Sequence, residues 1–187
     1  MQVLYAPDEA GKAEAARLLS QQEEGIIINI TGKTWCVCGE NRAFNEAVCE
    51  SRQIPIFQAH HLGGTTIVFP GDLSIFAVHH GQSRFGRDCL DAACQYLLRK
   101  GLAAAVSHND LMLFDAGTRQ RYKVGSYGSN WVGQLTESVV HFSINSDVKL
   151  ISEICTKPMA KVPGALSRYG VTAEELLGEI VRERWDD

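Results

Sequence analysis

Long hydrophobic runs are missing from this sequence of 187 residues. None approaches the roughly 18–20 apolar residues that cross a bilayer. The N-terminal segment has no basic stretch followed by an apolar one, so we expect no secretory signal. Since 45% of the residues are hydrophobic, the chain holds enough apolar side chains for a closed core. We therefore expect a globular, cytoplasmic protein.

An excess of positive charge is also missing. Lys and Arg number 18 against 22 Asp and Glu, which gives a formal net charge of −4. Binding to a phosphate backbone requires clustered Lys and Arg. The sequence therefore predicts neither a nucleic-acid partner nor a membrane partner.

Metal and disulfide motifs are scarce as well. The six cysteines form no C-x-x-C pair, which weighs against a zinc site. The chain is too long and too rich in core residues to need a disulfide framework, so we interpret most cysteines as reduced, small hydrophobes. His79, His80, His108 and His141 are scattered, with no carboxylates at ligand spacing, and no metal site is predicted.

No repeat and no Pro- or Ser-rich linker divides the chain, so we predict a single domain over residues 1–187. Apolar residues recurring every three or four positions favour helices, and β-branched, alternating segments favour strands. Helices are predicted over about 7–22, over 43–49 after a cap at Asn41, from 88 to a stop at Gly101, over 147–154, and from a Thr172–Glu175 capping box towards Trp185.

Strands are predicted over 26–30, 35–39, 55–58, 65–69, 73–79, 103–106, 111–114, 122–127 and 138–145. Turn residues at 115–117 and 129–133 connect the later strands too briefly for parallel crossovers, which favours an antiparallel meander. The predicted fold class is α/β (α+β), with a mixed, largely antiparallel sheet flanked by helices.

Two glycine turns flank one predicted strand. Gly63 and Gly64 precede Thr65, and Pro70 and Gly71 end the strand. Glycine permits a positive φ and lets a ligand approach backbone N–H groups. Neither a phosphate loop nor a dinucleotide fingerprint fits, because no helix follows directly and no Gly-Lys-Ser/Thr occurs. Taken alone, ordinary β-turns are the simpler interpretation.

Lys123 begins the segment Lys-Val-Gly-Ser-Tyr-Gly-Ser. Gly125 and Gly128 weaken a strand unless something packs against the bare backbone. One interpretation is an ammonium group above a ligand, where it neutralises a carboxylate, phosphate or oxyanion. The other is a solvated lysine beside glycine bulges.

Several segments in this order resemble the lipoate/octanoate transferase and ligase family, which shares its fold with biotin protein ligases. The resemblance covers nearly the whole chain and rests on the following segments: Trp35-Cys-Val-Cys-Gly39, Ile54-Pro-Ile-Phe57, Gly63-Gly64-Thr65, Pro70-Gly71-Asp72-Leu73, Lys123-Val-Gly-Ser-Tyr-Gly128 and Phe142-Ser-Ile-Asn145. Each is short, but their order and spacing agree with the family.

The resemblance implies an apolar tunnel for an acyl chain, with the lysine beside the acyl carbonyl. It places substrate-binding or catalytic roles on Gly63, Gly64, Thr65, Pro70, Gly71, Lys123, Gly125, Ser126, Gly128 and Asn145. Many ligases of the family carry an Arg pair before the glycine loop, where this chain has Gln58 and Ala59, and this departure weakens the case for adenylate binding. His60 and His61 are candidates to supply the missing polar contacts, although adjacent strand residues point opposite ways.

One transferase branch of the family uses a cysteine nucleophile after the Asn-ending strand and its helix. Cys155 lies in that region, although the family's Pro-Cys-Gly is absent and Lys157 occupies the matching register. With a small shift of this loop, Cys155 comes close to Lys123, and we then expect the charge of Lys123 to lower the pKa of the Cys155 thiol. The alternative is a buried cysteine at a helix end.

Three functions follow from the resemblance. The first is transfer of an octanoyl or lipoyl group from an acyl carrier protein thioester to a lysine of a lipoyl-domain protein, with Cys155 as nucleophile, Lys123 as general base and oxyanion partner, and no cofactor. The second is a non-catalytic ligand- or protein-binding member. The third is an ATP- and Mg-dependent lipoate or biotin protein ligase.

Overall fold

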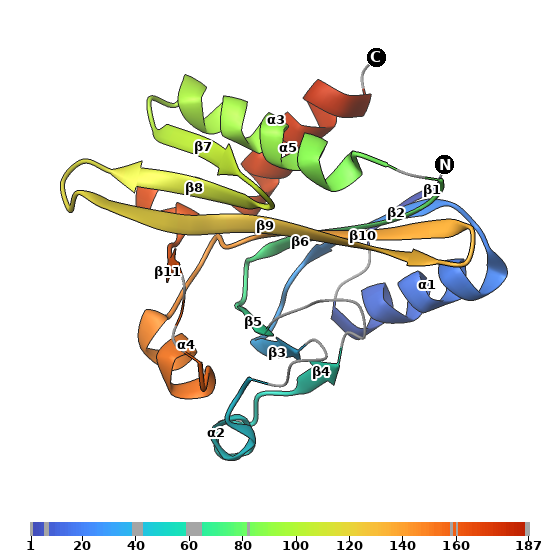
Figure 1. Ribbon diagram of the computed structural model, residues 1–187, viewed down its shortest axis with the longest axis horizontal. Coiled ribbons are helices and arrows are strands. Elements are labelled where there is room, and N and C mark those ends of the chain that lie inside the picture. Colours follow the sequence, from blue (N-terminus) through green and yellow to red (C-terminus); the bar gives the residue numbers. More distant parts are fainter. Residues whose placement is uncertain are drawn as a thin grey trace.

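A mixed sheet forms the middle layer of the molecule (Figure 1). The computed structural model describes residues 2–5, 8–38, 43–58, 65–81, 83–157, 159 and 161–185. Within them the main sheet has the strand order β1 (Gln2–Tyr5), β2 (Gly25–Ile30), β6 (Leu73–His80), β10 (Leu135–Phe142), β9 (Gln120–Val132), β8 (Asp110–Asp115) and β7 (Ala103–Ser107). A short strand, β11 (Val162–Pro163), pairs with β9. The β1–β2 and β9–β11 pairs are parallel and the other pairs are antiparallel.

Helices cover both faces of this sheet (Figure 1). On one face lie α3 (Phe85–Arg99) and α5 (Ala173–Trp185). The other face carries α1 (Asp8–Gln21) and a second sheet, whose order is β4 (Ile56–Gln58), β3 (Trp35–Cys38) and β5 (Thr65–Val68). Two short helices, α2 (Glu46–Ser51) and α4 (Val148–Ile154), pack beside the second sheet. The mixed, largely antiparallel fold predicted from the sequence is confirmed, with two sheets instead of one.

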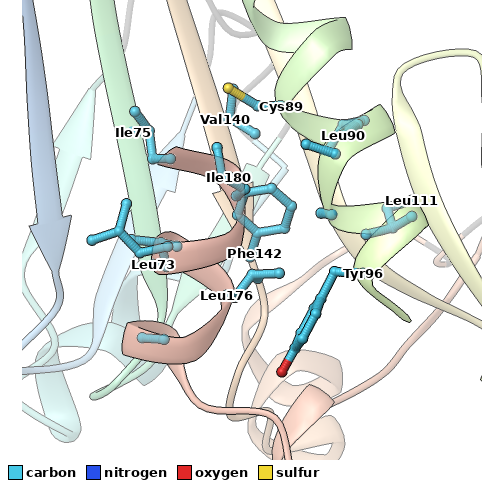
Figure 2. Packing of buried hydrophobic residues seen from close by; sticks show 14 of the residues in the cluster. Leu73, Ile75, Cys89, Leu90, Tyr96, Leu111, Val140, Phe142, Leu176 and Ile180 are labelled. Atoms are coloured by element: carbon cyan, nitrogen blue, oxygen red, sulfur yellow. The ribbon is translucent and has the colours of Figure 1, made fainter. Parts of the chain in front are cut away.

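The main core fills the space between the sheet and the α3–α5 pair. Figure 2 shows Val140 and Phe142 of the sheet facing Leu90 of α3 and Ile180 of α5. All of these side chains are fully buried. Burial of apolar surface on this scale is the main stabilising contribution to such a fold.

Local sequence signals account for most helix boundaries. Thr172 Oγ1 accepts the N–H of Glu175 at 3.2 Å, and Glu175 Oε2 accepts the N–H of Thr172 at 3.4 Å, which confirms the capping box before α5. Asp147 caps α4 through the N–H of Leu150. Helix α3 begins at Phe85, earlier than predicted, where Ser83 Oγ accepts the first N–H. A further turn, η1 (Leu166–Tyr169), precedes α5.

The helix predicted over 43–49 is misplaced. Helix α2 begins at Glu46, and its cap is Asn45, whose Oδ1 accepts the N–H of Val48. Phe44 is not helical, because its backbone forms an isolated β-bridge with Cys155. Asn41, the predicted cap, lies outside the described residues.

The turn predicted over 129–133 is also wrong in extent. Strand β9 continues to Val132, and Gly133, at φ +66°, forms the turn into β10. Ser129 pairs with Ser138 and Trp131 with Thr136, so ladder hydrogen bonds override the local turn propensity. The predicted antiparallel meander of β7, β8, β9 and β10 is confirmed.

All six cysteines are free thiols, and five of them are buried, as expected for reduced core residues. In the part of the chain described, none of the helices has the length and apolar character required to pass through a membrane.

Candidate functional site

A cavity of about 110 Å³ opens between the two sheets, beside α4. Strand β5 of the small sheet, strands β9 and β10 of the main sheet, helix α4 and strand β11 all contribute to its wall. The lining residues are Thr65, Thr66, Ile67, Lys123, Gly125, Ser126, His141, Ser143, Ser146, Ile151, Cys155 and Pro163. Five of the predicted site residues, Thr65, Lys123, Gly125, Ser126 and Cys155, therefore meet at one place.

A β-bulge in β9 brings two of these side chains to the same face. Lys123 pairs with Met112 and Gly125 with Leu111, so Val124 is an extra residue in the ladder. In an unbroken strand, side chains alternate, and Lys123 and Ser126 would point to opposite faces. The extra residue resets the alternation, and both line the cavity.

Gly125 has a packing role besides forming part of the cavity wall. A Cβ at this position would lie 3.0 Å from Phe142 Cδ1 and 3.3 Å from Leu111 Cβ. Both of those side chains belong to the main core. The missing side chain therefore makes room for the core on the face opposite Lys123.

Lys123 is held by a carboxylate. Its Nζ lies 2.8 Å from Asp110 Oδ1, and Lys161 Nζ binds the other oxygen, Oδ2. Burial opposes ionisation of Asp110, but hydrogen bonds from both lysines outweigh it and keep the pKa of this carboxyl below its ordinary value. The cluster of Lys123, Lys161 and Asp110 carries one net positive charge.

Cys155 follows α4 and is half-buried. Burial, followed by the neighbouring Cys49 thiol, raises the pKa of Cys155 above its ordinary value. The expectation that Lys123 lowers the pKa of this thiol is therefore wrong, because desolvation disfavours the thiolate and Asp110 already pairs with the nearby ammonium.

The polar character of the wall differs from the apolar tunnel that the resemblance implied. Hydroxyl-bearing residues line it beside Ile67 and Ile151: Thr65, Thr66, Ser126, Ser143 and Ser146. Thr65 Oγ1 is buried and has no hydrogen-bond partner among the described residues. A buried hydroxyl without a partner is uncommon in folded proteins.

Three predicted site residues lie together outside this cavity. Asn145 Nδ2 donates to the carbonyl oxygen of Pro70 at 2.6 Å. Gly71 adopts φ +86°, and a Cβ there would lie 2.7 Å from Asn145 Nδ2. In the structure these residues join the β5–β6 turn to the end of β10, and their part in ligand binding stays a prediction.

The remaining predicted residues divide into two groups. Gly128 lies farther along β9, opposite Val139, and is not part of the cavity wall. His60, His61, Gly63 and Gly64 lie outside the described residues, so their predicted roles stay untested.

Sequence reasoning assigned no role in this site to His141, Ser143, Asp72 or Asp110. His141 and Ser143 alternate at the end of β10, a period-two pattern that places both on one face. Asp110 gave no signal, because its partner Lys123 lies on another strand. Among the described residues no group of three or more His, Cys, Asp or Glu side chains is placed to hold a metal ion.

Comparison with known proteins shows similarity in structure and none in sequence. No protein-family model matches the chain, and no curated protein matches it. Among solved structures, the bipartite lipoate protein ligase of Thermoplasma acidophilum, studied with its E2 lipoyl domain, matches with a TM-score of 0.76 and 13% identity over 97% of this chain and 81% of the other. LipL1 of P. falciparum in complex with lipoate matches with a TM-score of 0.77 and 12% identity, over 97% of this chain and 60% of the other.

A lipoate-protein ligase A bound with ATP matches with a TM-score of 0.75 and 14% identity, over 97% of this chain and 83% of the other. Biotin protein ligases match with lower TM-scores, from 0.50 to 0.56. At these identities the similarity concerns the fold. The chain has the fold of the biotin and lipoate protein ligases.

Proposed function

We propose that this protein attaches an octanoyl or lipoyl group to a lysine of an acceptor protein, taking it from a carrier thioester. The observation that carries this proposal is the cavity in which Lys123 and Cys155, from β9 and the end of α4, meet. An acyl transferase needs a nucleophile and a positive charge near one carbonyl group. The solved structures of lipoate ligases, one with lipoate and one studied with a lipoyl domain, support an acyl ligand and a protein acceptor.

In the proposed reaction the Cys155 sulfur attacks the thioester carbonyl carbon, the carbon–sulfur bond to the carrier breaks, and the carrier leaves as a thiol with the Cys155 proton. The acceptor amine then attacks the new thioester, an amide bond forms, and Cys155 regains a proton from that amine. Lys123 stabilises the oxyanion in both steps. Its ion pair with Asp110 fits this role better than the role of general base.

Intact mass spectrometry after incubation with octanoyl-carrier protein tests the proposal. We expect an octanoyl adduct on the wild-type protein and on Cys94→Ala, a control for a buried cysteine of α3. We expect none on Cys155→Ala, and transfer to a lipoyl domain lost in Lys123→Met. Absence of both adduct and transfer in the wild-type protein would contradict the transferase.

A second candidate, an ATP-dependent lipoate or biotin ligase, is favoured by the similar ligase structure that holds ATP. This reaction needs no cysteine. Pyrophosphate release by Cys155→Ala in the presence of lipoate, ATP and Mg²⁺ identifies it. Saturable octanoate binding with neither adduct nor pyrophosphate indicates the third candidate, a non-catalytic binding protein.

A further inference from the structure

His141 lies at the inner wall of the cavity, and its ring is held from two sides. It is buried, and it stands opposite Ser74 on β6, whose Oγ lies 3.2 Å from His141 Nδ1. The other ring nitrogen, Nε2, lies 3.5 Å from Ser143 Oγ and 3.6 Å from Asp72 Oδ2. The contact with Ser143 is at the long limit of a hydrogen bond and the approach of Asp72 exceeds that limit, so both partners hold Nε2 only weakly.

The two ring nitrogens differ in their access to a ligand. Ser143, beside Nε2, lines the cavity, whereas Ser74, beside Nδ1, is buried and does not. Nε2 therefore lies between Ser143, on the cavity side, and the buried Asp72, which is not part of the cavity wall. The carboxylate near Nε2 favours the tautomer with its proton on this nitrogen, and Ser74 can then donate its O–H to Nδ1.

The ring is neutral at physiological pH. Burial, and then the charge of Lys123, lowers the pKa of His141 to about 4. The approach of Asp72 to His141 is therefore not an ion pair at neutral pH. Asp72 is fully buried, and its two oxygens accept the N–H groups of Phe69 and Asn145 at 2.8 Å each, which fixes this carboxyl in place.

We propose that His141 is a substrate-contacting residue whose Nε2–H donates a hydrogen bond to the carbonyl oxygen that Lys123 also contacts. The inference rests on the proposed function, since it names a second donor for the acyl carbonyl. A neutral imidazole can serve as such a donor without giving up its proton. Ser74 orients the ring, and Asp72 keeps the turn beside it rigid.

Ser74, His141 and Asp72 are the residue types of a hydrolase triad, but the serine lies at Nδ1 and the carboxyl group lies nearer Nε2, the reverse of that arrangement, and the serine cannot act as a nucleophile. Ser74 is 6% exposed and is not part of the cavity wall. A nucleophile must reach the reacting carbon. The imidazole is the member of this group that meets the ligand.

Replacing His141 by Gln or by Asn distinguishes the roles of its two ring nitrogens. His141→Gln places an amide N–H near the position of Nε2, whereas His141→Asn reaches only the position of Nδ1. We expect His141→Gln to bind octanoate within about threefold of the wild-type protein, and His141→Asn to bind at least about tenfold more weakly and to transfer octanoyl about 100-fold more slowly. His79→Gln, a histidine bonded to Ser138 outside the cavity, is the matched control and should behave as wild type.

The outcomes separate this inference from the proposed function. If the wild-type protein transfers octanoyl and both amide variants match it, the inference is wrong and the function stands. If the wild-type protein binds octanoate without reaction and the Gln–Asn difference persists, the inference stands and the transferase fails. Calorimetry measures the binding, and long-range ¹H–¹⁵N NMR of the wild-type imidazole provides a test independent of folding, because a proton on Nδ1 in place of Nε2 would overturn the donor role.

Discussion

Asp110 places a carboxylate oxygen 2.8 Å from the ammonium nitrogen of Lys123, and its other oxygen binds Lys161. The lysine that the sequence singled out for a ligand is thus already paired with an acid in the free protein. Under the proposed function, a bound carboxylate competes with Asp110 for this ammonium group. That proposal therefore makes ligand binding depend on a residue outside the sequence motifs.

Asp110→Asn should strengthen octanoate binding by up to about fivefold, because it removes that competition and both lysines are more than one-third exposed, which limits the gain. Calorimetric titration measures the change. Asp91→Asn, which breaks an exposed ion pair with Arg87 on α3, is the control and should leave binding unchanged. Weaker binding by Asp110→Asn would show that Asp110 serves to hold Lys123 in position.

Cys155 should react slowly with iodoacetamide at pH 7. Burial raises the pKa of its thiol, and the thiolate is the reacting species. The rate should rise about tenfold per pH unit between pH 6 and 8 and continue to rise above the ordinary pKa of a thiol. Mass spectrometry follows the alkylation, and Cys155→Ala identifies the labelled site. A rate that stops rising below pH 8 would mean that Lys123 activates the thiol after all.

Asp72 and His141 should balance each other in the pH dependence of stability. Burial raises the pKa of Asp72 to about 7 and lowers that of His141 to about 4. Between about pH 4 and 6.5 the folded pair holds its proton on Asp72, and the unfolded pair holds it on the histidine. The pair therefore binds one proton in both the folded and the unfolded state. It adds almost nothing to the change of the free energy of unfolding with pH.

Replacing Asp72 or His141 alone should make the free energy of unfolding depend on pH, in opposite directions for the two variants. In Asp72→Asn, His141 binds a proton in the unfolded state but not in the folded state. The free energy of unfolding therefore falls on acidification by up to about 1.4 kcal/mol per pH unit. In His141→Gln, Asp72 binds a proton in the folded state but not in the unfolded state, so the free energy of unfolding rises on acidification. Urea unfolding at several pH values measures both, and two variants with slopes of the same sign would refute the pairing.

Gly125→Ala should destabilise the fold by about 1–3 kcal/mol, because its methyl group would meet Phe142 and the carbonyl oxygen of His141 at 3.0 and 3.2 Å. Gly178→Ala on α5 is the matched control. Nothing lies within 4 Å of its Cβ position, and alanine favours the helix by up to about 1 kcal/mol. Equal effects of the two changes in urea unfolding would contradict the packing role of Gly125.

The candidate site could be predicted in part. The glycine-containing lysine strand and the cysteine after α4 were both recognised, and Lys123, Ser126 and Cys155 do line one cavity. The partner of Lys123 could not be predicted, because Asp110 and Lys123 meet only through the pairing of β8 with β9. His141 was noticed only as one of several scattered histidines, since its neighbours Ser74 and Asp72 come from another part of the chain.

Features that depend on near neighbours could be predicted from local sequence patterns. Thr172 and Glu175 start α5, Asp147 starts α4, and the spacing of apolar residues marks α3. Long-range packing is responsible for the second sheet, the bulge at Val124 and the charge environment of Cys155 and His141. Caps and amphipathic faces arise from residues within a turn or two of each other, whereas strand register and desolvation arise only when distant segments pack together.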